Sequence, residues 1–256
     1  MKKITLLAVA ATISASAFAD MNLWDLSTGD FSQDWTNTAL ISTDDNWSGV
    51  ASVMGYRGDE LVAGTGVDPQ TILAPAGLTP GLVVDVNANR TDPNTFLTGG
   101  VAEFELTNAT VALNGSGTAD APSLNFFVNA SGRTNVSIGY LLRDLDGSAD
   151  NSVQPIALQY RLSSTSDFIN VGSAFVADAS SGPSLATLTT PVFATNSLWD
   201  NQAYLEFRVI TANAVGNDEW IGVDDIRIAS EAIPEPATMV VLGAAALAAA
   251  ARRKRK

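Results

Sequence analysis

Acidic side chains dominate the chemistry that this sequence can support. The chain of 256 residues contains 27 Asp and Glu residues, no histidine and no cysteine. Catalytic Ser-His-Asp and Cys-His arrangements are therefore impossible, as are zinc or copper sites with histidine ligands. Two kinds of chemistry stay open. One is acid–base catalysis by carboxylates, as in glycosidases, and the other is the binding of hard cations such as Ca²⁺ through oxygen.

The first acidic cluster spans residues 143–151 and reads RDLDGSADN. Asp144, Asp146 and Asp150 flank Gly147, which permits a tight reversal of the chain. Oxygen ligands spaced two residues apart around such a bend can converge on one Ca²⁺. The complete EF-hand pattern is absent, and Asp-Gly is also a common hairpin turn. The cluster is therefore interpreted either as a calcium site or as a plain turn.

The second acidic cluster spans residues 216–226 and reads GNDEWIGVDDI. Asp224 and Asp225 are adjacent in a β-prone segment, so their side chains must point to opposite faces, and at least one faces the packed side. A buried carboxylate needs a partner, for which Arg208, Arg227 and calcium are the candidates. The candidate calcium ligands of both clusters are Asp144, Asp146, Asp150, Asp218, Glu219, Asp224 and Asp225.

The charge balance restricts the possible partners. Of the 14 Lys and Arg residues, Lys2 and Lys3 lie near the start of the chain and five lie within 252–256, which leaves seven arginines against 27 acids. The region between the ends therefore has a net charge near −20, which disfavours binding to nucleic acid and to anionic membrane surfaces. Acidic surfaces suit divalent cations, and they also keep exported proteins soluble.

Short β-prone segments separated by Gly, Asn, Asp and Pro fill the region between the ends. Several of them alternate apolar and polar residues with a period of two, and no long stretch between the ends shows helical periodicity. The expected strands are Gly81–Val86, Val101–Leu106, Thr110–Leu113, Leu124–Val128, Val136–Leu142, Ile156–Leu162, Ala203–Ile210 and Ile221–Ile228. This pattern predicts an all-β domain over residues 20–231, an antiparallel β-sandwich or jelly roll.

Three of the five tryptophans lie in the less regular N-terminal part of the domain. Trp24, Trp35 and Trp47 could either fill the core of the sandwich or stack on sugar rings at its surface. The core is the commoner place for such residues, so we expect them to be buried.

The first 19 residues have the pattern of a secretory signal peptide. Lys2 and Lys3 form a short positive region, an apolar stretch follows, and Ala17 and Ala19 form the small-x-small pattern that signal peptidase cleaves. The apolar stretch is too short to span a bilayer comfortably. We therefore expect export across the inner membrane and a mature chain that begins at Asp20.

The last 25 residues, 232–256, have a three-part pattern. An extended Pro-Glu-Pro tripeptide comes first, then an uncharged, Ala-rich stretch over 237–251, then a basic end. A helix over that stretch would cross about two-thirds of the roughly 30 Å hydrocarbon core, so we expect a short hydrophobic helix that anchors the chain only transiently, with its basic end inside. The motif residues are Pro234, Glu235, Pro236, Arg252, Arg253, Lys254, Arg255 and Lys256.

This C-terminal pattern resembles the PEP-CTERM sorting signal. The resemblance implies processing near the tripeptide by an exosortase, a membrane-embedded protease or transpeptidase of Gram-negative bacteria that make extracellular polysaccharide. It implies a destination at the cell surface or in the extracellular matrix. The chemistry at this motif would belong to the sorting enzyme and not to this chain.

The central region resembles a jelly-roll module of large secreted bacterial proteins. The segments that carry this resemblance are Gly99–Phe104, Gly115–Pro122, Ala157–Arg161 and Trp220–Ile226. Such modules are accessory and non-catalytic. The closing strand is also similar to that of carbohydrate-binding and adhesion sandwiches that hold a structural calcium, a likeness at the level of the fold.

These observations favour a non-catalytic surface or matrix protein whose sandwich is an interaction module, with a structural Ca²⁺ and extracellular polysaccharide as the expected partners. Two alternatives stay open. The domain could be a carboxylate-based enzyme that cleaves glycans, or a structural scaffold that self-associates through the edges of its sheets.

Overall fold

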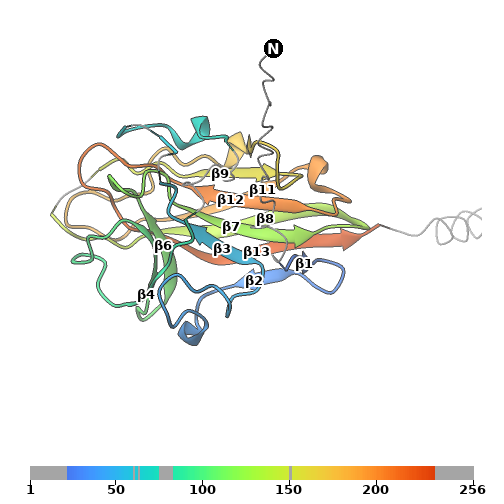
Figure 1. The fold of residues 1–256 in the computed structure, drawn as a ribbon, viewed down its shortest axis with the longest axis horizontal. Helices are drawn as coiled ribbons and strands as arrows, with labels where there is room; N and C mark the ends of the chain where they lie inside the picture. Colours follow the sequence, from blue (N-terminus) through green and yellow to red (C-terminus); the bar gives the residue numbers. More distant parts are fainter. Residues whose placement is uncertain (1–21, 60, 63, 75–82, 150–151, 234–256) are drawn as a thin grey trace, which may run out of the picture.

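The computed structural model describes residues 22–59, 61–62, 64–74, 83–149 and 152–233 (Figure 1). Several sequence predictions lie outside these residues: the signal peptide with Ala17 and Ala19, the ligand candidate Asp150, the C-terminal hydrophobic helix, and the motif residues Pro234, Glu235, Pro236, Arg252, Arg253, Lys254 and Arg255. They stay predictions.

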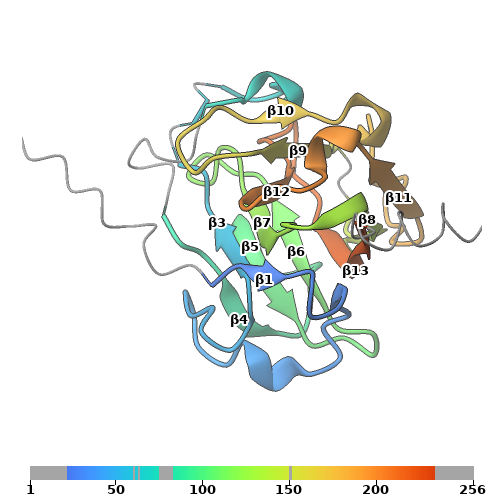
Figure 2. The same cartoon turned by 90° about the vertical axis from the view of Figure 1, so that its right-hand side faces the viewer.

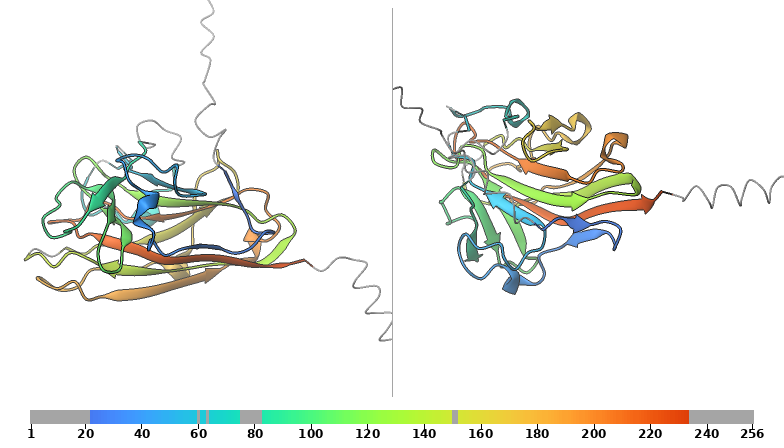
Figure 3. Two further views of the ribbon diagram at one scale, coloured as in Figure 1. Left: turned by 90° about the horizontal axis from the view of Figure 1, so that it is seen from below. Right: turned by 45° about the vertical axis from the view of Figure 1, so that its right-hand side comes forward.

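Two β-sheets packed face to face form a sandwich, and Figures 2 and 3 show the two layers. The first sheet has the order β1 (Trp24–Asp25), β7 (Ser123–Asn129), β12 (Leu205–Ile210), β9 (Ala157–Arg161) and β10 (Ile169–Asn170), with β3 (Val53–Tyr56) also on β7. The second has the order β11 (Thr189–Thr195), β8 (Arg133–Asp144), β13 (Ile221–Ala232), β6 (Thr110–Asn114), β5 (Gly100–Phe104) and β4 (Asn87–Arg90), with β2 (Phe31–Gln33) also on β13. Short 3-10 turns lie at Thr38–Leu40, Pro69–Thr71, Gly172–Ala174 and Ser197–Trp199.

The predicted all-β sandwich is confirmed, with two differences in detail. Most strand pairs are antiparallel, but β1 pairs with β7 and β4 pairs with β5 in parallel. The segment expected as a strand over Gly81–Val86 contributes, in its described part, only an isolated bridge between Val84 and Tyr56. The strand next to it is β4, whose sequence NANR has little β propensity and is held by β5.

The core lies between the sheets, and the N-terminal tryptophans contribute to it. Trp35 and Trp47 are 2% and 4% exposed, and their rings meet edge to face with centroids 6.4 Å apart. The indole N–H groups donate to the backbone oxygens of Val223, at 2.8 Å, and Asp85, at 3.1 Å. Burial of these two residues is confirmed, while Trp24 is half-buried at the edge of the core.

The longest pairing in the sandwich joins β8 and β13, each of 12 residues. Its register runs from Ile221 opposite Asp144 at one end to Ala232 opposite Arg133 at the other. The register shifts after Asp224, where Asp225 has a φ of +49°, so a bulge bends β13 here. The pair therefore connects the end of the sandwich that holds both acidic clusters with the end where the C-terminal segment leaves.

Glu103 is a buried acid in the middle of β5. It is 2% exposed, Oε2 accepts a hydrogen bond from the Asn89 N–H at 2.8 Å, and Oε1 has no partner among the described residues. Burial raises the pKa of Glu103 to about 7. The folded state therefore binds a proton more tightly than the unfolded chain does, so this group stabilises the fold as the pH falls from about 7 toward its ordinary pKa near 4.5.

We predict that Glu103→Gln raises the free energy of unfolding at pH 8 by about 2 kcal/mol, because the buried charge is removed. The variant should also lose much of the gain in stability that the wild type shows between pH 8 and pH 5. Chemical denaturation across this pH range measures both effects. Glu105→Gln is the matched control, since Glu105 is exposed and directly follows β5. An unchanged pH profile in Glu103→Gln would contradict the prediction.

Candidate functional site

A polar pocket of about 420 Å³ lies at the end of the sandwich where β13 begins. Figure 1 shows the loops of this end on the left. Four chain segments form it: the loop 91–99, the end of β6 with the loop after it, the loop after β8, and the loop 211–220 before β13. Binding sites commonly lie on such loops, because the rigid sheets beneath hold them in position. The polar residues that line it are Asn94, Asn114, Ser116, Asp146, Ser148, Asn213, Asn217 and Asp218.

The pocket brings together one member of each acidic cluster. Asp146 is 8% exposed and its Oδ1 accepts a hydrogen bond from the Ser148 N–H at 2.9 Å. Asp218 Oδ1 accepts from the Ala214 N–H at 2.7 Å, and burial raises the pKa of this carboxyl to about 6. Both carboxylates therefore shape their own loops, and both residues line the pocket.

Asparagine side chains supply the neutral polar groups of the pocket. Asn94 Oδ1 accepts from the Gly147 N–H at 2.6 Å, and Asn114 Nδ2 donates to the backbone oxygen of Asp218 at 3.0 Å, so two amides tie neighbouring loops together. Asn213 also lines the pocket, and its side chain is 8% exposed. A side-chain amide can both donate a hydrogen bond to a ligand and accept one from it.

An aromatic cluster supports the wall of the pocket. Trp220 stacks on Phe96 with centroids 5.7 Å apart and meets Phe104 edge to face at 5.1 Å. Its indole N–H donates to the backbone oxygen of Phe96 at 2.8 Å. These contacts fix the loop 91–99 against the second sheet, while Leu97 at the rim is 89% exposed.

Asp224 lies outside the pocket, and its partner differs from those expected. It is buried, and its Oδ2 accepts from Arg143 Nη1 at 2.7 Å and from Asn108 Nδ2 at 3.1 Å. The prediction of Arg208 or Arg227 was wrong, because these two side chains reach other groups: Arg208 donates to the side chain of Gln159 and to the Ile72 carbonyl, and Arg227 pairs with Asp30. The opposite orientations of the adjacent acids are confirmed, since Asp225 is exposed.

Two further acids of these clusters, Asp144 and Glu219, are buried. Asp144 is 4% exposed, and its two oxygens accept from the N–H groups of Ser181 at 2.6 Å and Asp146 at 3.2 Å. Glu219 is 2% exposed, and its backbone N–H donates to Gln154 Oε1 at 3.3 Å. Across the described part of the chain, no group of three acidic residues lies close enough to hold a metal ion.

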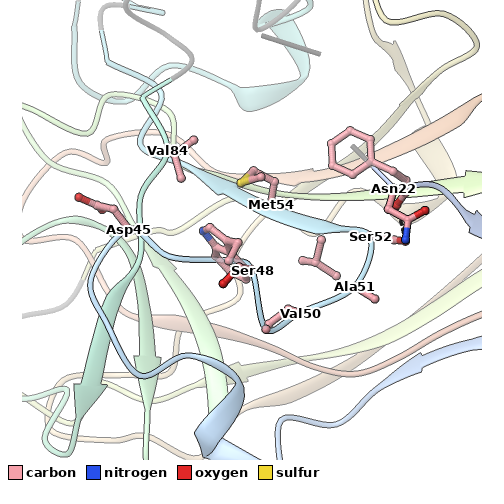
Figure 4. A pocket seen from close by; sticks show the side chains of 12 residues that line it. Asn22, Asp45, Ser48, Val50, Ala51, Ser52, Met54 and Val84 are labelled. Carbon is pink, nitrogen blue, oxygen red and sulfur yellow. Dashed lines mark hydrogen bonds between the residues drawn. The ribbon is translucent and has the colours of Figure 1, made fainter. Parts of the chain in front are cut away.

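A second, larger hollow of about 640 Å³ runs along β3 (Figure 4). In Figure 4, Asp45 and Asn22 lie at opposite ends of this groove, with Met54 and Val84 between them. Its remaining lining is mainly small or apolar, and Asp45 is the single charged residue among the described lining residues. The groove therefore offers fewer polar groups than the pocket at the loop end.

Sequence reasoning missed the asparagines of the pocket and the groove along β3. It considered acidic residues and tryptophans, and Asn94, Asn114 and Asn213 occur in ordinary turn contexts. Their convergence depends on pairings between distant strands, so no local signal was available to find them. The one usable sign was the density of Asn and Gly around the two acidic clusters.

The comparison with protein families identifies the C-terminal pattern. Residues 232–256 match the family described as the PEP-CTERM protein-sorting motif, which confirms the resemblance and indicates export and membrane-associated sorting to the cell surface. No curated protein matches the chain at a significant level. Among the described residues, no helix has the length and apolar character needed to cross a membrane.

Solved structures with a similar fold include adhesin and carbohydrate-binding domains. The K2 cleaved adhesin domain of Lys-gingipain is 14% identical, with 78% of this chain and 98% of that chain covered and a TM-score of 0.40. A carbohydrate-binding module specific for non-crystalline cellulose, CBM28, is 13% identical, with 57% and 99% covered and a TM-score of 0.35. TmCBM61, solved with β-1,4-galactotriose, is 13% identical, with 48% and 72% covered and a TM-score of 0.32. At these identities and TM-scores, the likenesses say nothing of what this chain binds.

The ion pair of Arg143 and Asp224 gives a direct test of how the second acidic cluster is held. We predict that Arg143→Leu lowers the free energy of unfolding by about 3 kcal/mol, because it leaves a buried carboxylate without its cation. Arg227→Leu removes one arginine from the exposed pair with Asp30 and should cost less than about 1 kcal/mol. Denaturant melts measure both, and equal losses would contradict the assignment.

Proposed function

We propose that this chain is an exosortase-sorted surface protein whose sandwich is a non-catalytic module that binds neutral polysaccharide in the loop-end pocket. The observation that carries the proposal is the set of side chains in this pocket. Four loops direct amides, hydroxyls and two carboxylates into it, and no Lys or Arg is among its described lining residues. Sugar hydroxyls both donate and accept hydrogen bonds, so amides and carboxylates are suitable partners for them.

The charge of the pocket favours a neutral ligand. Asp146 and Asp218 face it from two sides, and the whole region between the ends of the chain is strongly acidic. A polysaccharide with carboxylate, sulfate or phosphate groups would therefore be repelled at the pocket. Hydroxyl groups of a neutral sugar can instead donate to the carboxylate oxygens.

The position of the pocket suits display on a surface. The pocket adjoins the start of β13, and the sorting motif follows the end of the same strand. Twelve residues of extended strand separate the two by about 35–40 Å. A chain held at its C-terminal segment would carry the pocket on the end of the sandwich away from the attachment point.

The processing steps belong to the same proposal. Signal peptidase would cleave after Ala19, and an exosortase would process the chain near Pro234 to Pro236 after a transient anchoring in the inner membrane. The mature domain would then reside at the surface or in the extracellular matrix of a Gram-negative bacterium. The sorting motif supports these steps.

Glycan cleavage is the second candidate function, because Asp146 and Asp218 share a pocket and a glycosidase needs two carboxylates. We prefer binding, since each of these carboxylates already accepts a backbone hydrogen bond within its own loop. Self-association through sheet edges is less favoured, because β10 is two residues long and the edge strand β11 contains Pro191, which cannot donate to a ladder.

We predict that the full-length chain, purified in mild detergent, binds immobilised neutral polysaccharides, and that Asn213→Ala weakens this binding about tenfold. The matched control is Asn22→Ala, which removes the same group from the groove of Figure 4. The affinity is measured from the fraction of the chain that the immobilised polysaccharide removes from solution. Release of reducing ends from the polysaccharide, lost in Asp218→Asn, would instead support glycan cleavage. Binding that is weakened by Asn22→Ala and not by Asn213→Ala would place the binding site in the groove.

Calcium binding is a separate proposal, which we restrict to Asp146 and Asp218. Asp144 and Asp224 are already satisfied by protein donors, whereas the pocket offers two carboxylates together with amide and backbone oxygens of the kind that Ca²⁺ takes. We predict that 5–10 mM Ca²⁺ raises Tm by about 3 °C relative to excess chelator. Asp218→Asn should remove this difference, and Asp225→Asn, an exposed control, should keep it. An equal Tm in calcium and chelator would reject the proposal.

A further inference from the structure

An apolar pocket of about 410 Å³ adjoins the polar pocket. The two hollows share Asn213 as a lining residue, and the loop that separates them runs from this residue to Asp218. The side chains that line the apolar pocket include Val67, Val153, Phe175 and Val215, of which Val153 and Val215 are 61% and 73% exposed. Exposed branched residues around a hollow of this kind favour an apolar group as its occupant.

Asn213 is held firmly at the boundary between the two pockets. Its backbone N–H donates to the Asp120 carbonyl at 2.9 Å, and its carbonyl accepts from the Gly66 N–H at 2.7 Å. The side chain is 8% exposed, and the residue lines both pockets. Its amide therefore offers one donor side and one acceptor side at a fixed place.

The charges of both pockets exclude one large class of ligand. Asp146 and Asp218 line the polar pocket, and Asp68 is the single charged residue among those described that line the apolar one. Asp68 also caps a 3-10 turn, since its Oδ1 accepts from the Gln70 N–H at 2.9 Å. With acids on both sides and no arginine or lysine in either described lining, uronic acids and sulfated or phosphorylated sugars are disfavoured.

We propose, building on the proposed function, that the ligand is a neutral glycan with N-acetylated amino sugars. The sugar hydroxyls bind in the polar pocket and the acetamido group pairs with the side-chain amide of Asn213. A secondary amide presents one N–H and one C=O, which match the acceptor and the donor that Asn213 offers. The methyl group of the acetamide then lies against Val153 and Val215 in the apolar pocket.

Other substituents fit these two pockets less well. A 6-deoxy sugar would place a methyl group in the apolar pocket but leave the Asn213 amide without a partner. An O-acetyl ester accepts hydrogen bonds but donates none, so it satisfies one side of the amide. The acetamido group satisfies both sides and also fills the apolar pocket.

The test measures how tightly the full-length chain, in mild detergent, binds neutral oligosaccharides. The oligosaccharides are used in pairs built from glucose, galactose or mannose units. The two members of a pair differ only in having a hydroxyl or an acetamido group at carbon 2. We expect the acetamido member of at least one pair to bind about fivefold to tenfold more tightly. Val215→Ser should reduce this preference to about twofold or less, because it removes the apolar surface but no hydrogen bond. Phe193→Ser is the matched control, since Phe193 is 68% exposed on β11, away from both pockets, and should keep the preference.

The outcomes separate this inference from the proposed function. If the hydroxyl and acetamido members of every pair bind equally, and Asn213→Ala weakens both, the preference for the acetamido group is refuted. The proposed binding of neutral glycans in the polar pocket is then retained. A preference that survives Val215→Ser would also overturn it, because the methyl group would then lie elsewhere. Binding of no neutral oligosaccharide, or tighter binding of a uronic acid oligomer, would overturn both.

Discussion

The pairing of β8 with β13 is the interaction on which the rest of the structure depends. The two strands form the centre of the second sheet, with β11 beyond β8, and β6 and β2 on the other side of β13. The buried pair of Arg143 and Asp224 lies between these two strands, next to the bulge. Loss of their register would separate the loops at the pocket from the strand that leads to the sorting motif.

Both faces of most central strands are covered. Every residue of β5, β6, β9 and β12 is buried, so buried acids such as Glu103 and Glu206 need partners inside the protein. At the end of the sandwich, polar side chains from four loops line a pocket instead. The result is a rigid scaffold with one polar pocket built from distant parts of the chain.

Sequence patterns identify much of the fold and little of the pocket. Period-two alternation locates the central strands, and the terminal motif is readable because its order and place are specific. The short strands β1, β2 and β10 are held by their neighbours and have no pattern of their own. The partner of Asp224 is 81 residues away on an adjacent strand, and Asp146 and Asp218 line one pocket although they lie far apart in the sequence, so neither relation is visible from local sequence.

The central claim is that ligand binds at the loop end of the sandwich, and hydrogen–deuterium exchange of the full-length chain with a neutral oligosaccharide tests it most directly. Ligand that covers backbone amides or stabilises loops slows their exchange. The account predicts slower exchange within 91–99, 114–118 and 213–218, with residues 45–54 along the groove unchanged. Slower exchange confined to 45–54, with no change in the three loop segments, would contradict it.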